Sequence, residues 1–351
     1  MANTSSPQHR DSHRSLTRRS FGVLALGSFS ALALAACGAS NSSDSNASAS
    51  SASTSAKPAP SALPSGMGST AGDGEFPRTV KHFRGETKIE SAPKSVVILS
   101  TGQLDDVLAL GLVPIGAATA NDADLVPEYL KTKFSDKSAE LDKIAKVGKR
   151  TEPDLGAIAN LHPDLILINN TNKKEEVYES LSKIAPTVVT EGTGHNWKQD
   201  FLMIASALGT TSKAEEMLKD YEDKAKKLGE KAGQEKTFSF LYAAGDRTRV
   251  YAKSSFVGSI CEDASLARPA VQQEGKTSID LSSENLDQAD GDYLFYGVQG
   301  GNESKLTSET LWESLKAVKE KHAHKVDADM FYLNAGITAA LGVIEEIDKN
   351  I

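Results

Sequence analysis

Polar, charged and aromatic side chains gather at the points where the predicted strands of this chain end. Ligands of open α/β sheets bind beyond the carboxyl ends of the strands, so side chains at these points can reach one cleft. Arginine side chains there can hold an anionic group, and aromatic rings can form apolar walls. The pattern therefore predicts a cleft for a polar, partly aromatic and anionic ligand. The segments concerned are 100–103, 119–121, 148–150, 169–171 and 194–197 in the first half of the chain, and 244–249, 296–299 and 330–332 in the second half.

Two further motifs contain the residue types of other chemistry. Residues 270–277 match a relaxed phosphate-loop pattern, but such a loop needs a glycine-rich turn between a strand and a helix, and no predicted strand leads into this segment. His322 and His324 stand two residues apart and are followed by Asp327 and Asp329, a set that could make a zinc site. We interpret the first motif as a chance match and the two histidines as solvated surface residues. Because neither HExxH nor GxSxG occurs, we predict no catalytic residue, no bound metal and no cofactor.

The elements that must position the cleft alternate between strands and helices. Short apolar runs predict strands over 95–99, 113–118, 164–168 and 187–189, with helices over 104–110, 155–159 and 177–184 between them. Such alternation implies a mostly parallel sheet covered on both faces. The pattern restarts with strands over 237–241 and 292–296 and helices over 311–318 and 337–347.

A purely helical stretch separates the two alternating regions. One helix face includes residues 201–208, and a capping box over 212–215 predicts the start of a second helix that runs to about residue 231. A helix of some 20 residues spans about 30 Å, enough to cross from one lobe to another. We therefore predict an α/β fold with two Rossmann-like lobes, mostly parallel sheets, one long joining α-helix and a ligand cleft between the lobes. The predicted domains are an N-terminal lobe over 76–196, connecting helices over 197–233 and a C-terminal lobe over 234–351.

The composition excludes several classes of protein. The chain has 351 residues, 39 Lys+Arg against 47 Asp+Glu, a formal net charge of -8 and 2 Cys, which excludes a small disulfide scaffold and a fully disordered chain. An acidic chain without a Lys/Arg stripe lacks the electrostatic pattern of a nucleic-acid binder, so we predict no nucleic-acid partner. The longest uncharged apolar run, 21–36, has 16 residues, which is short of the ~20 needed to span a membrane.

Residues 1–36 have the order of an export signal, because arginines precede an apolar run that ends in small residues. Arg18 and Arg19 lie in a twin-arginine pattern. The run ends in Leu-Ala-Ala-Cys, which resembles the bacterial lipobox and predicts cleavage before Cys37 and lipid on that residue; the alternative is a plain secretory peptide with a chance cysteine. Residues 37–75 are rich in Ser and Ala, so we predict a disordered tether that anchors the protein to the cell membrane on its extracytoplasmic face. Cys261 is then left without a partner, and we predict a buried, inert thiol.

From about residue 76 to 351 the chain resembles the substrate-binding lipoproteins of iron-siderophore ABC importers, the group whose two lobes are joined by one long helix. The segments that carry the resemblance are 78–82, 93–99, 106–116, 152–155, 162–166 and 283–292. The resemblance implies a monomeric receptor that encloses a ferric siderophore and delivers it to a membrane permease with its ATPase subunit. Only small closure is expected on binding, because a continuous helix resists bending. The ligand-binding residues are then Arg150, Arg247 and Arg249 as anion contacts, Trp197, Phe256, Tyr296, Phe331 and Tyr332 as walls, and Thr101, Asn121 and Asn170 as further cleft residues.

In the family that this chain resembles, one exposed carboxylate on each lobe docks onto arginines of the permease. Glu284 matches the second-lobe position, whereas the first-lobe glutamate falls at Gly156. Either Glu152 or Asp154 substitutes for it, or first-lobe docking is weaker.

Two other functions stay open on sequence grounds. The first is a haem- or corrinoid-binding lipoprotein of the same fold, with His195 and Tyr332 as candidate axial ligands for haem. The second is an exported, lipid-anchored enzyme. The sequence also leaves the siderophore class open, because catecholate complexes favour several arginines and hydroxamate complexes favour aromatic walls, and the predicted cleft offers both.

Overall fold

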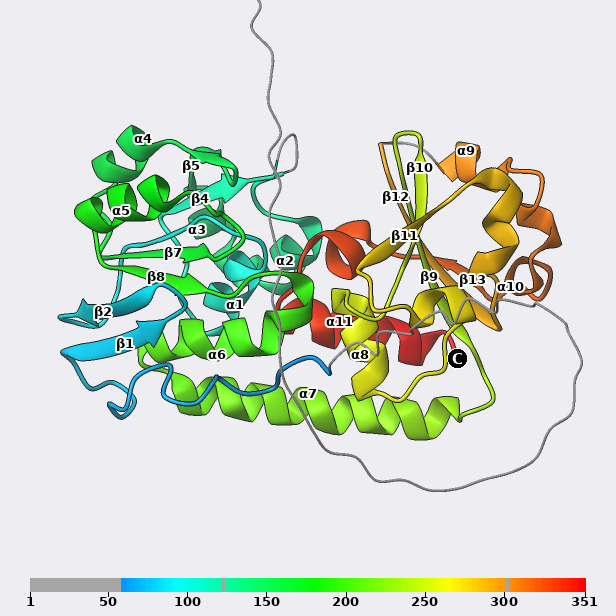
Figure 1. The fold of residues 1–351 in the computed structure, drawn as a ribbon, viewed down its shortest axis with the longest axis horizontal. Helices are drawn as coiled ribbons and strands as arrows, with labels where there is room; N and C mark the ends of the chain where they lie inside the picture. Colours follow the sequence, from blue (N-terminus) through cyan, green and yellow to red (C-terminus); the bar gives the residue numbers. More distant parts are fainter. Residues whose placement is uncertain (1–57, 121–123, 301–302) are drawn as a thin grey trace, which may run out of the picture. The chain divides into compact units, whose positions relative to one another are not determined.

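The computed structural model describes residues 58–120, 124–300 and 303–351 (Figure 1). The predicted signal peptide, the lipidation site Cys37 and the cleft residue Asn121 lie outside the described residues. None of the helices in the described part of the chain is both long enough and apolar enough to cross a membrane.

The N-terminal lobe is built on a six-stranded sheet of order β6-β5-β4-β3-β7-β8, in which every pair is parallel except β5 with the edge strand β6. All residues of β3 and β7 are buried, as expected of parallel strands covered on both faces. The predicted strand at 113 begins three residues later, because Pro114 interrupts the run and has no N–H to donate. The strands are β3 (Val96–Ile98), β4 (Gly116–Thr119), β5 (Ala145–Lys149), β6 (Glu152–Pro153), β7 (Leu165–Asn169) and β8 (Thr187–Thr190).

Helices cover both faces of this sheet, and a separate hairpin packs beside β8. One face lies against α4 and α5, and the other lies against α1 and α6. The hairpin is β1 (Arg78–His82) with β2 (Gly85–Ile89), and the helices of this lobe are α1 (Gln103–Ala109), α2 (Glu128–Lys133), η1 (Ser135–Lys137), α3 (Ser138–Leu141), α4 (Leu155–Asn160) and α5 (Glu175–Ile184).

The C-terminal lobe is built on a five-stranded sheet of order β11-β10-β9-β12-β13. The pairs β9 with β12 and β12 with β13 are parallel, whereas β10 pairs antiparallel with both β9 and β11. This sheet is therefore mixed, with its antiparallel half made by the hairpin β9–β10. The strands are β9 (Phe238–Ala244), β10 (Arg247–Tyr251), β11 (Ser278–Leu281), β12 (Tyr293–Gln299) and β13 (Ala323–Lys325), and the helices are α8 (Phe256–Asp263), η3 (Ala270–Gln273), η4 (Ser283–Ala289), α9 (Glu303–Thr307), η5 (Trp312–Ser314), α10 (Lys316–Lys319), η6 (Asp329–Leu333) and α11 (Ile337–Lys349).

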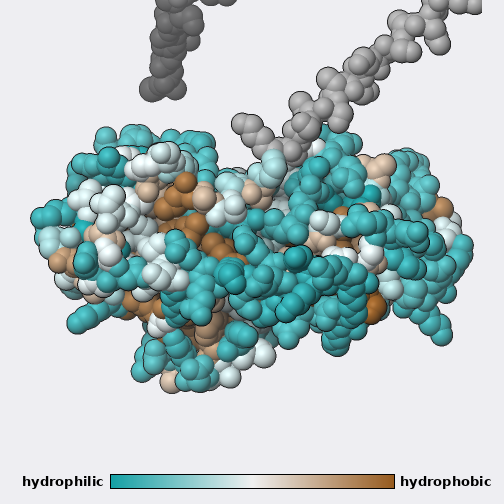
Figure 2. All heavy atoms as spheres, turned by 90° about the horizontal axis from the view of Figure 1, so that it is seen from below, coloured by the Kyte–Doolittle hydropathy of each residue, from teal (hydrophilic) through white to brown (hydrophobic). Residues whose placement is uncertain are grey.

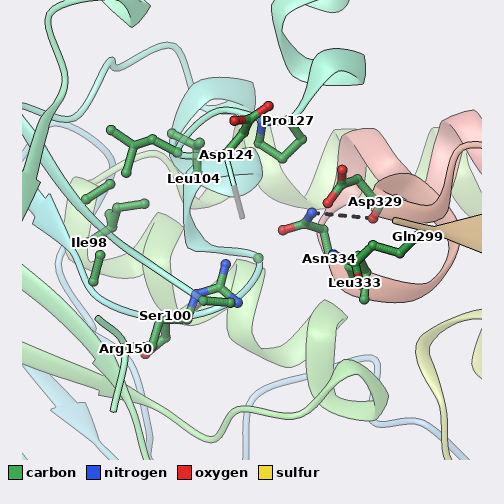
Figure 3. Close-up of a pocket in the computed structure, with 15 residues that line it drawn as sticks. Ile98, Ser100, Leu104, Asp124, Pro127, Arg150, Gln299, Asp329, Leu333 and Asn334 are labelled. Carbon is green, nitrogen blue, oxygen red and sulfur yellow. Dashed lines mark hydrogen bonds between the residues drawn. The ribbon is translucent and has the colours of Figure 1, made fainter. Parts of the chain in front are cut away.

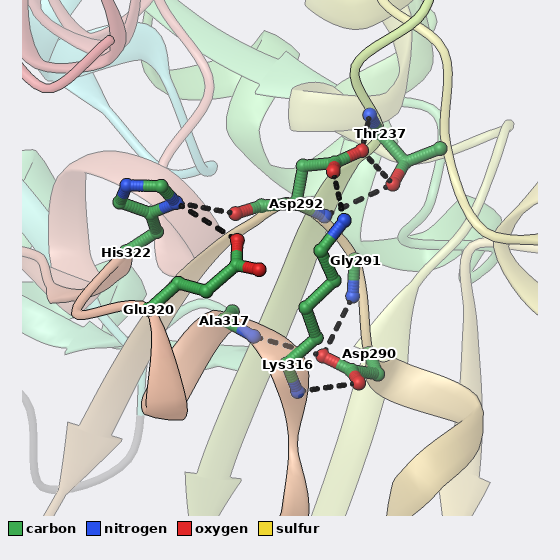
Figure 4. A network of polar contacts seen from close by, with 8 residues as sticks. All are labelled: Thr237, Asp290, Gly291, Asp292, Lys316, Ala317, Glu320 and His322. Carbon is green, nitrogen blue, oxygen red and sulfur yellow. Dashed lines mark hydrogen bonds and ion pairs between the residues drawn. The ribbon is translucent and has the colours of Figure 1, made fainter.

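The helix predicted over 311–318 is broken into η5 and α10. Leu315 between them is extended, with φ -60° and ψ 138°. The carboxylate of Asp290, from the loop before β12, accepts hydrogen bonds from the backbone N–H groups of Lys316 (2.7 Å) and Ala317 (3.2 Å) and so begins α10 afresh. Asp292 belongs to the same network (Figure 4), and its carboxylate accepts a hydrogen bond from the backbone N–H of Thr237, just before β9. The Lys316 ammonium lies 2.6 Å from this carboxylate and lowers the pKa of Asp292 to about 2.

A helical connection joins the two sheets through η2 (Gly194–Asn196), α6 (Trp197–Leu208) and α7 (Thr211–Ala232). The 22-residue α7 runs beneath both sheets in Figure 1, as the long joining helix predicted from the sequence. Its buried residues form one stripe at helical spacing. The surface of the molecule seen from below, in Figure 2, is mainly hydrophilic. The stripe consists of Ala214, Leu218, Tyr221, Ala225 and Leu228.

The start of α7 differs from the predicted capping box. The helix begins at Thr211, and the carboxylate of Asp73 accepts hydrogen bonds from the N–H groups of Thr211 (2.8 Å) and Ser212 (2.9 Å). Asp73 belongs to the stretch predicted as a free tether. Ser69 N–H also donates to the Ser206 hydroxyl, and Gly74 N–H donates to the Gly209 carbonyl. The segment from about residue 68 to 75 is therefore bound to the connecting helices, which corrects the tether prediction for this part.

Candidate functional site

A pocket of about 350 Å³ lies at the carboxyl ends of β3 and β4 and extends to the C-terminal lobe. Its polar side chains come from both lobes (Figure 3): Arg150 and Asp124 belong to the first, and Asp329 and Asn334 belong to the second. Gly102 makes the close approach of the lobes possible. A Cβ on this residue would lie 2.1 Å from the carbonyl oxygen of Ala335, and its φ of +84° also favours glycine.

Two neighbouring pockets continue this space along the N-terminal lobe. One, of about 410 Å³, shares Ser100 and Arg150 with the first pocket and adds Lys173 and Lys174. The other, of about 160 Å³, shares Thr101 with the second pocket and reaches the side chains of Trp197 and Asp200. The three pockets together follow the carboxyl ends of the strands, as the sequence predicts for a ligand site.

Arg150 is the central cation of the site. It follows β5 directly, and its backbone N–H donates to the Thr119 carbonyl at the end of β4. One guanidinium nitrogen donates to the Thr101 hydroxyl, while the buried Nε has no hydrogen-bond partner among the described residues. Burial lowers the Arg150 pKa, against the opposing influence of Asp329. A buried N–H that lacks a partner is costly, so this guanidinium is suited to an external acceptor.

Arg249 on β10 is the corresponding cation of the C-terminal lobe. Its guanidinium carbon lies 5.8 Å from the centre of the Tyr242 ring, and its buried Nε also has no partner among the described residues. The Tyr242 hydroxyl donates to Oε1 of Gln299 at 2.6 Å, and Gln299 lines the central pocket. Arg249 is thereby linked through Tyr242 to the edge of the site.

The other arginines of the described chain have internal partners. Arg84 pairs with Glu175, Arg247 with Asp280 and Arg268 with Glu262. Arg78 donates to backbone carbonyls, including that of Ser206 at 2.8 Å. Arg247 was predicted as an anion contact, but it is exposed and paired with Asp280 at 2.7 Å, so the structure does not bring it to the pocket. Only Arg150 and Arg249 have neither a carboxylate nor a backbone carbonyl as side-chain partner within the described residues.

Most of the predicted aromatic walls lie in the core. Phe331 is fully buried and stacks on Phe295, and the Tyr296 hydroxyl donates to Glu303 on the far side of the sheet. Tyr332 is also buried, and its hydroxyl donates to the Phe295 carbonyl at 2.8 Å. These three side chains therefore do not form walls of the pocket in this structure, because packing of the C-terminal sheet takes up their faces.

Trp197 does reach the pocket system, although it is almost completely buried. It lines the 160 Å³ pocket, and its indole N–H donates to the Ser259 hydroxyl at 3.1 Å. Phe256 is buried behind it, with the two rings in an edge contact at 5.8 Å between their centres. Phe256 therefore supports Trp197 from behind.

Of the two asparagines at the end of β7, the pockets are lined by Asn169 and not by the predicted Asn170. Asn170 was predicted to face the cleft, but its amide accepts from Arg84 and donates to Glu191. Asn169 lines two of the pockets instead. Asp124 was not predicted from the sequence, and Asp329 was named only among the residues of a zinc set. The signal that could have found Asn169 was the period of two along a strand, which places adjacent residues on opposite faces.

Buried carboxylates hold the frame of the site. Asp105 on α1 accepts from the backbone N–H groups of Thr338 (2.8 Å) and Ala339 (2.9 Å) at the start of α11. Asp200 accepts from two backbone N–H groups in the loop after β8, and burial raises its pKa to about 7. Asp105 thus joins α1 to the start of α11 in the C-terminal lobe, and Asp200 joins α6 to the loop after β8.

The described part of the chain contains neither a group of residues suited to bind a metal ion nor an exposed thiol. It contains no group of three or more His, Cys, Asp or Glu residues that could hold a metal ion. Cys261 is buried as predicted, and burial raises the pKa of its thiol to about 12, so it stays protonated at neutral pH. The Tyr332 hydroxyl, a candidate haem ligand in the sequence analysis, is occupied by its bond to the Phe295 carbonyl.

The fold and the site define a two-lobe binding protein whose lobes are joined by one long helix. The chain belongs to the periplasmic binding protein family, which it matches over residues 96–330. A Bacillus subtilis (strain 168) protein named probable siderophore-binding lipoprotein YfiY is 34% identical over 289 residues, covering 77% of this chain and 86% of that protein. The iron(3+)-hydroxamate-binding protein FhuD of the same organism is 29% identical over 287 residues, covering 78% and 86%. The crystal structure of Staphylococcus aureus SirA complexed with staphyloferrin B shares 30% identity and a TM-score of 0.67, covering 78% of this chain and 97% of that one.

Proposed function

We propose that this protein is the extracytoplasmic substrate-binding component of an ABC importer and captures a ferric siderophore between its two lobes. The observation that carries the proposal is the pair Arg150 and Arg249, one on each lobe, whose buried Nε atoms have no partner among the described residues. Arg150 lines the pocket and Arg249 is linked to its edge through Tyr242 and Gln299, so the two cations suit a large ligand that carries oxygen acceptors. The names of YfiY, FhuD and SirA's ligand support the same class.

The iron would be cargo held by its chelator, so the protein would need to contact only the chelator's periphery. Arg150 would donate hydrogen bonds to chelator oxygens from the first lobe, and Arg249 would do so from the second. Thr101 would orient Arg150, and Trp197 would form the apolar floor of the adjacent small pocket. Haem is less well supported, because the hydroxyl of Tyr332 is already bonded within the core.

Lipid attachment at Cys37 and docking onto a permease complete the proposal. Glu284 on η4 and Glu152 on β6 are both exposed, one on each lobe, as docking carboxylates must be. We propose these two residues as the contacts with the permease, whose ATPase subunit would drive transport. A lipid anchor would keep the receptor at the membrane, and we propose that it works as a monomer.

The test is calorimetric titration of the chain from residue 37, carrying Cys37→Ser so that no lipid is attached. The ligands are a ferric hydroxamate, a ferric catecholate, haem and cobalamin. Saturable binding of a ferric siderophore is expected, and tight binding of haem or cobalamin with no ferric siderophore bound would refute the proposal. Arg150→Met and Arg249→Met should each weaken binding about ten- to a hundredfold, as for hydrogen bonds to charged groups. Arg247→Met, two residues from Arg249 but paired with Asp280, is the matched control and should change affinity less than twofold.

A further inference from the structure

The central pocket carries two carboxylates as well as its arginine. Asp124 comes from the loop after β4 and is exposed at the pocket, and Asp329 comes from η6 and is half-buried. Neither carboxylate has an ion-pair partner within 4 Å in the described part of the chain. Arg150 acts to lower the pKa of Asp329, but burial and the charges of Asp327 and Asp124 outweigh it, so the Asp329 pKa is raised.

Other aspartates of this chain show what a structural role looks like. Asp105 and Asp200 each accept two backbone N–H bonds, and Asp73 does the same at the start of α7. Asp292 is held by Thr237 and Lys316. Asp124 and Asp329 lack any such partner for their carboxylates in the described residues, yet they share one pocket. Within the described residues these two carboxylates neither cap a helix nor form an ion pair, so they are suited to bind a ligand.

The charges of the site are therefore separated along its length. Arg150 with Lys173 and Lys174 makes the side toward β7 basic, and Asp124 with Asp329 makes the side toward α2 and η6 acidic. The central pocket itself is lined by one cation, Arg150, and two anions, Asp124 and Asp329. A complex with a charge of about -3, as ferric tris-catecholates carry, would meet net repulsion in that pocket. A complex of low net charge with a cationic group would meet attraction at both ends.

On the basis of the proposed function, we propose that the ligand is a ferric siderophore of near-neutral or positive net charge that carries a protonated amine. Its ammonium group binds at Asp124 and Asp329, while its iron-chelating oxygens face Arg150. The two carboxylates come from opposite lobes, so the ammonium group also ties the lobes together when the ligand is bound.

The experiment compares two ligands that differ only in this amine. Ferrioxamine B is a ferric tris-hydroxamate with one ammonium group, and its N-acetylated form is the same complex without that charge. We expect N-acetylation to weaken binding to the unmodified mature chain about tenfold or more, the effect of losing a charge-assisted hydrogen bond. In the variant Asp124→Asn with Asp329→Asn, the two complexes should bind within twofold of each other.

The control variant is Asp142→Asn, which removes one exposed carboxylate of the N-terminal lobe outside the pocket and should leave the tenfold preference unchanged. Equal binding of the two ferrioxamines by the unmodified chain would overturn the inference. So would tighter binding of ferric enterobactin, a trianionic tris-catecholate, than of ferrioxamine B. In both cases the proposed function would stand, whereas a lack of binding by every ferric complex would refute the proposed function itself.

Discussion

Replacement of Asp105 tests how the two lobes are held together. Asp105 lies on α1, and its carboxylate accepts three hydrogen bonds: from the N–H groups of Thr338 and Ala339 on α11, and from the Tyr129 hydroxyl at 3.0 Å. A Cβ on Gly336 would lie 2.6 Å from the side chain of Asp105, so the starts of α1 and α11 are in direct contact. The change Asp105→Ala leaves three donors without an acceptor, and those of Ala339 and Tyr129 are buried.

The expected loss follows from counting these donors. A buried donor without a partner costs about 1–3 kcal/mol, so the two buried donors alone cost about 2–6 kcal/mol. Burial raises the pKa of Asp105, which means that its charged form is itself strained in the folded protein. Removing that carboxylate returns part of the cost. We therefore expect Asp105→Ala to lower the free energy of unfolding by about 3 kcal/mol, and Asp105→Asn, which keeps one acceptor oxygen, to lower it by about half as much.

Urea unfolding followed by circular dichroism measures this difference, with the midpoint and slope fitted for each variant. Asp142→Ala, which removes an exposed carboxylate of the same lobe, is the control and should stay within about 0.5 kcal/mol of the unmodified chain. A loss below about 1 kcal/mol for Asp105→Ala, or equal losses for the Ala and Asn variants, would show that these hydrogen bonds do not hold the lobes.

Four further outcomes are expected. The pKa of Asp200 is about 7 in the folded protein against 3.8 unfolded, so the folded state binds its proton more tightly. The free energy of unfolding should therefore fall by on the order of 4 kcal/mol as pH rises from about 4 to about 7. Urea titrations should show this fall greatly reduced in Asp200→Asn, and an unchanged pH profile in that variant would contradict the prediction. Asp73→Ala should cost about 1 kcal/mol of unfolding free energy, because the N–H groups of Thr211 and Ser212 lose their cap; Asp73→Asn should recover part of it, and no loss in either would argue against the cap. Gly156→Glu should increase iron uptake by cells that express the variant, because the new side chain supplies a first-lobe carboxylate. The position has room for it, since a Cβ there would approach only Asp154, at 3.4 Å. Gly156→Gln is the control, and equal uptake by both variants would refute a role for the charge. Binding of the ferric ligand should leave the radius of gyration in X-ray scattering nearly unchanged, and a large decrease would show that α7 bends.

The sequence predicted those elements whose pattern is local. The apolar runs of β3 and β7 and the buried stripe of α7 were predicted because each pattern lies within its own segment. The break between η5 and α10 was missed because Asp290, 26 residues away, begins the second helix. The start of α7 was misplaced for the same reason, since Asp73 lies 138 residues from Thr211. Helix ends that are capped from a distance cannot be read from the helix sequence alone.

The candidate site was predicted in its location but only partly in its residues. Thr101, Arg150 and Trp197 line pockets because they follow strands or begin a helix at the carboxyl edge of the sheet. Phe331 also lies near that edge, but its ring turns into the core of the C-terminal lobe. Arg247 stands two residues from Arg249, yet its side chain pairs with the exposed Asp280 on the neighbouring strand β11. A position at the end of a strand thus predicts that a residue lies near the cleft. Its contacts with neighbouring residues decide whether its side chain faces the cleft.

The frame of this molecule leaves ligand selection to a few side chains. The helix α7 packs against both α6 and α11, and Asp105 joins α1 to α11 by hydrogen bonds that a large opening of the lobes would break. A cleft that opens little cannot choose ligands by closing to different extents. Selection then depends on the charges already in place, Arg150 with Lys173 and Lys174 on one side and Asp124 with Asp329 on the other. Because charges of both signs are present and separated, ligands with separated charge of both signs should be preferred over ligands of high single charge.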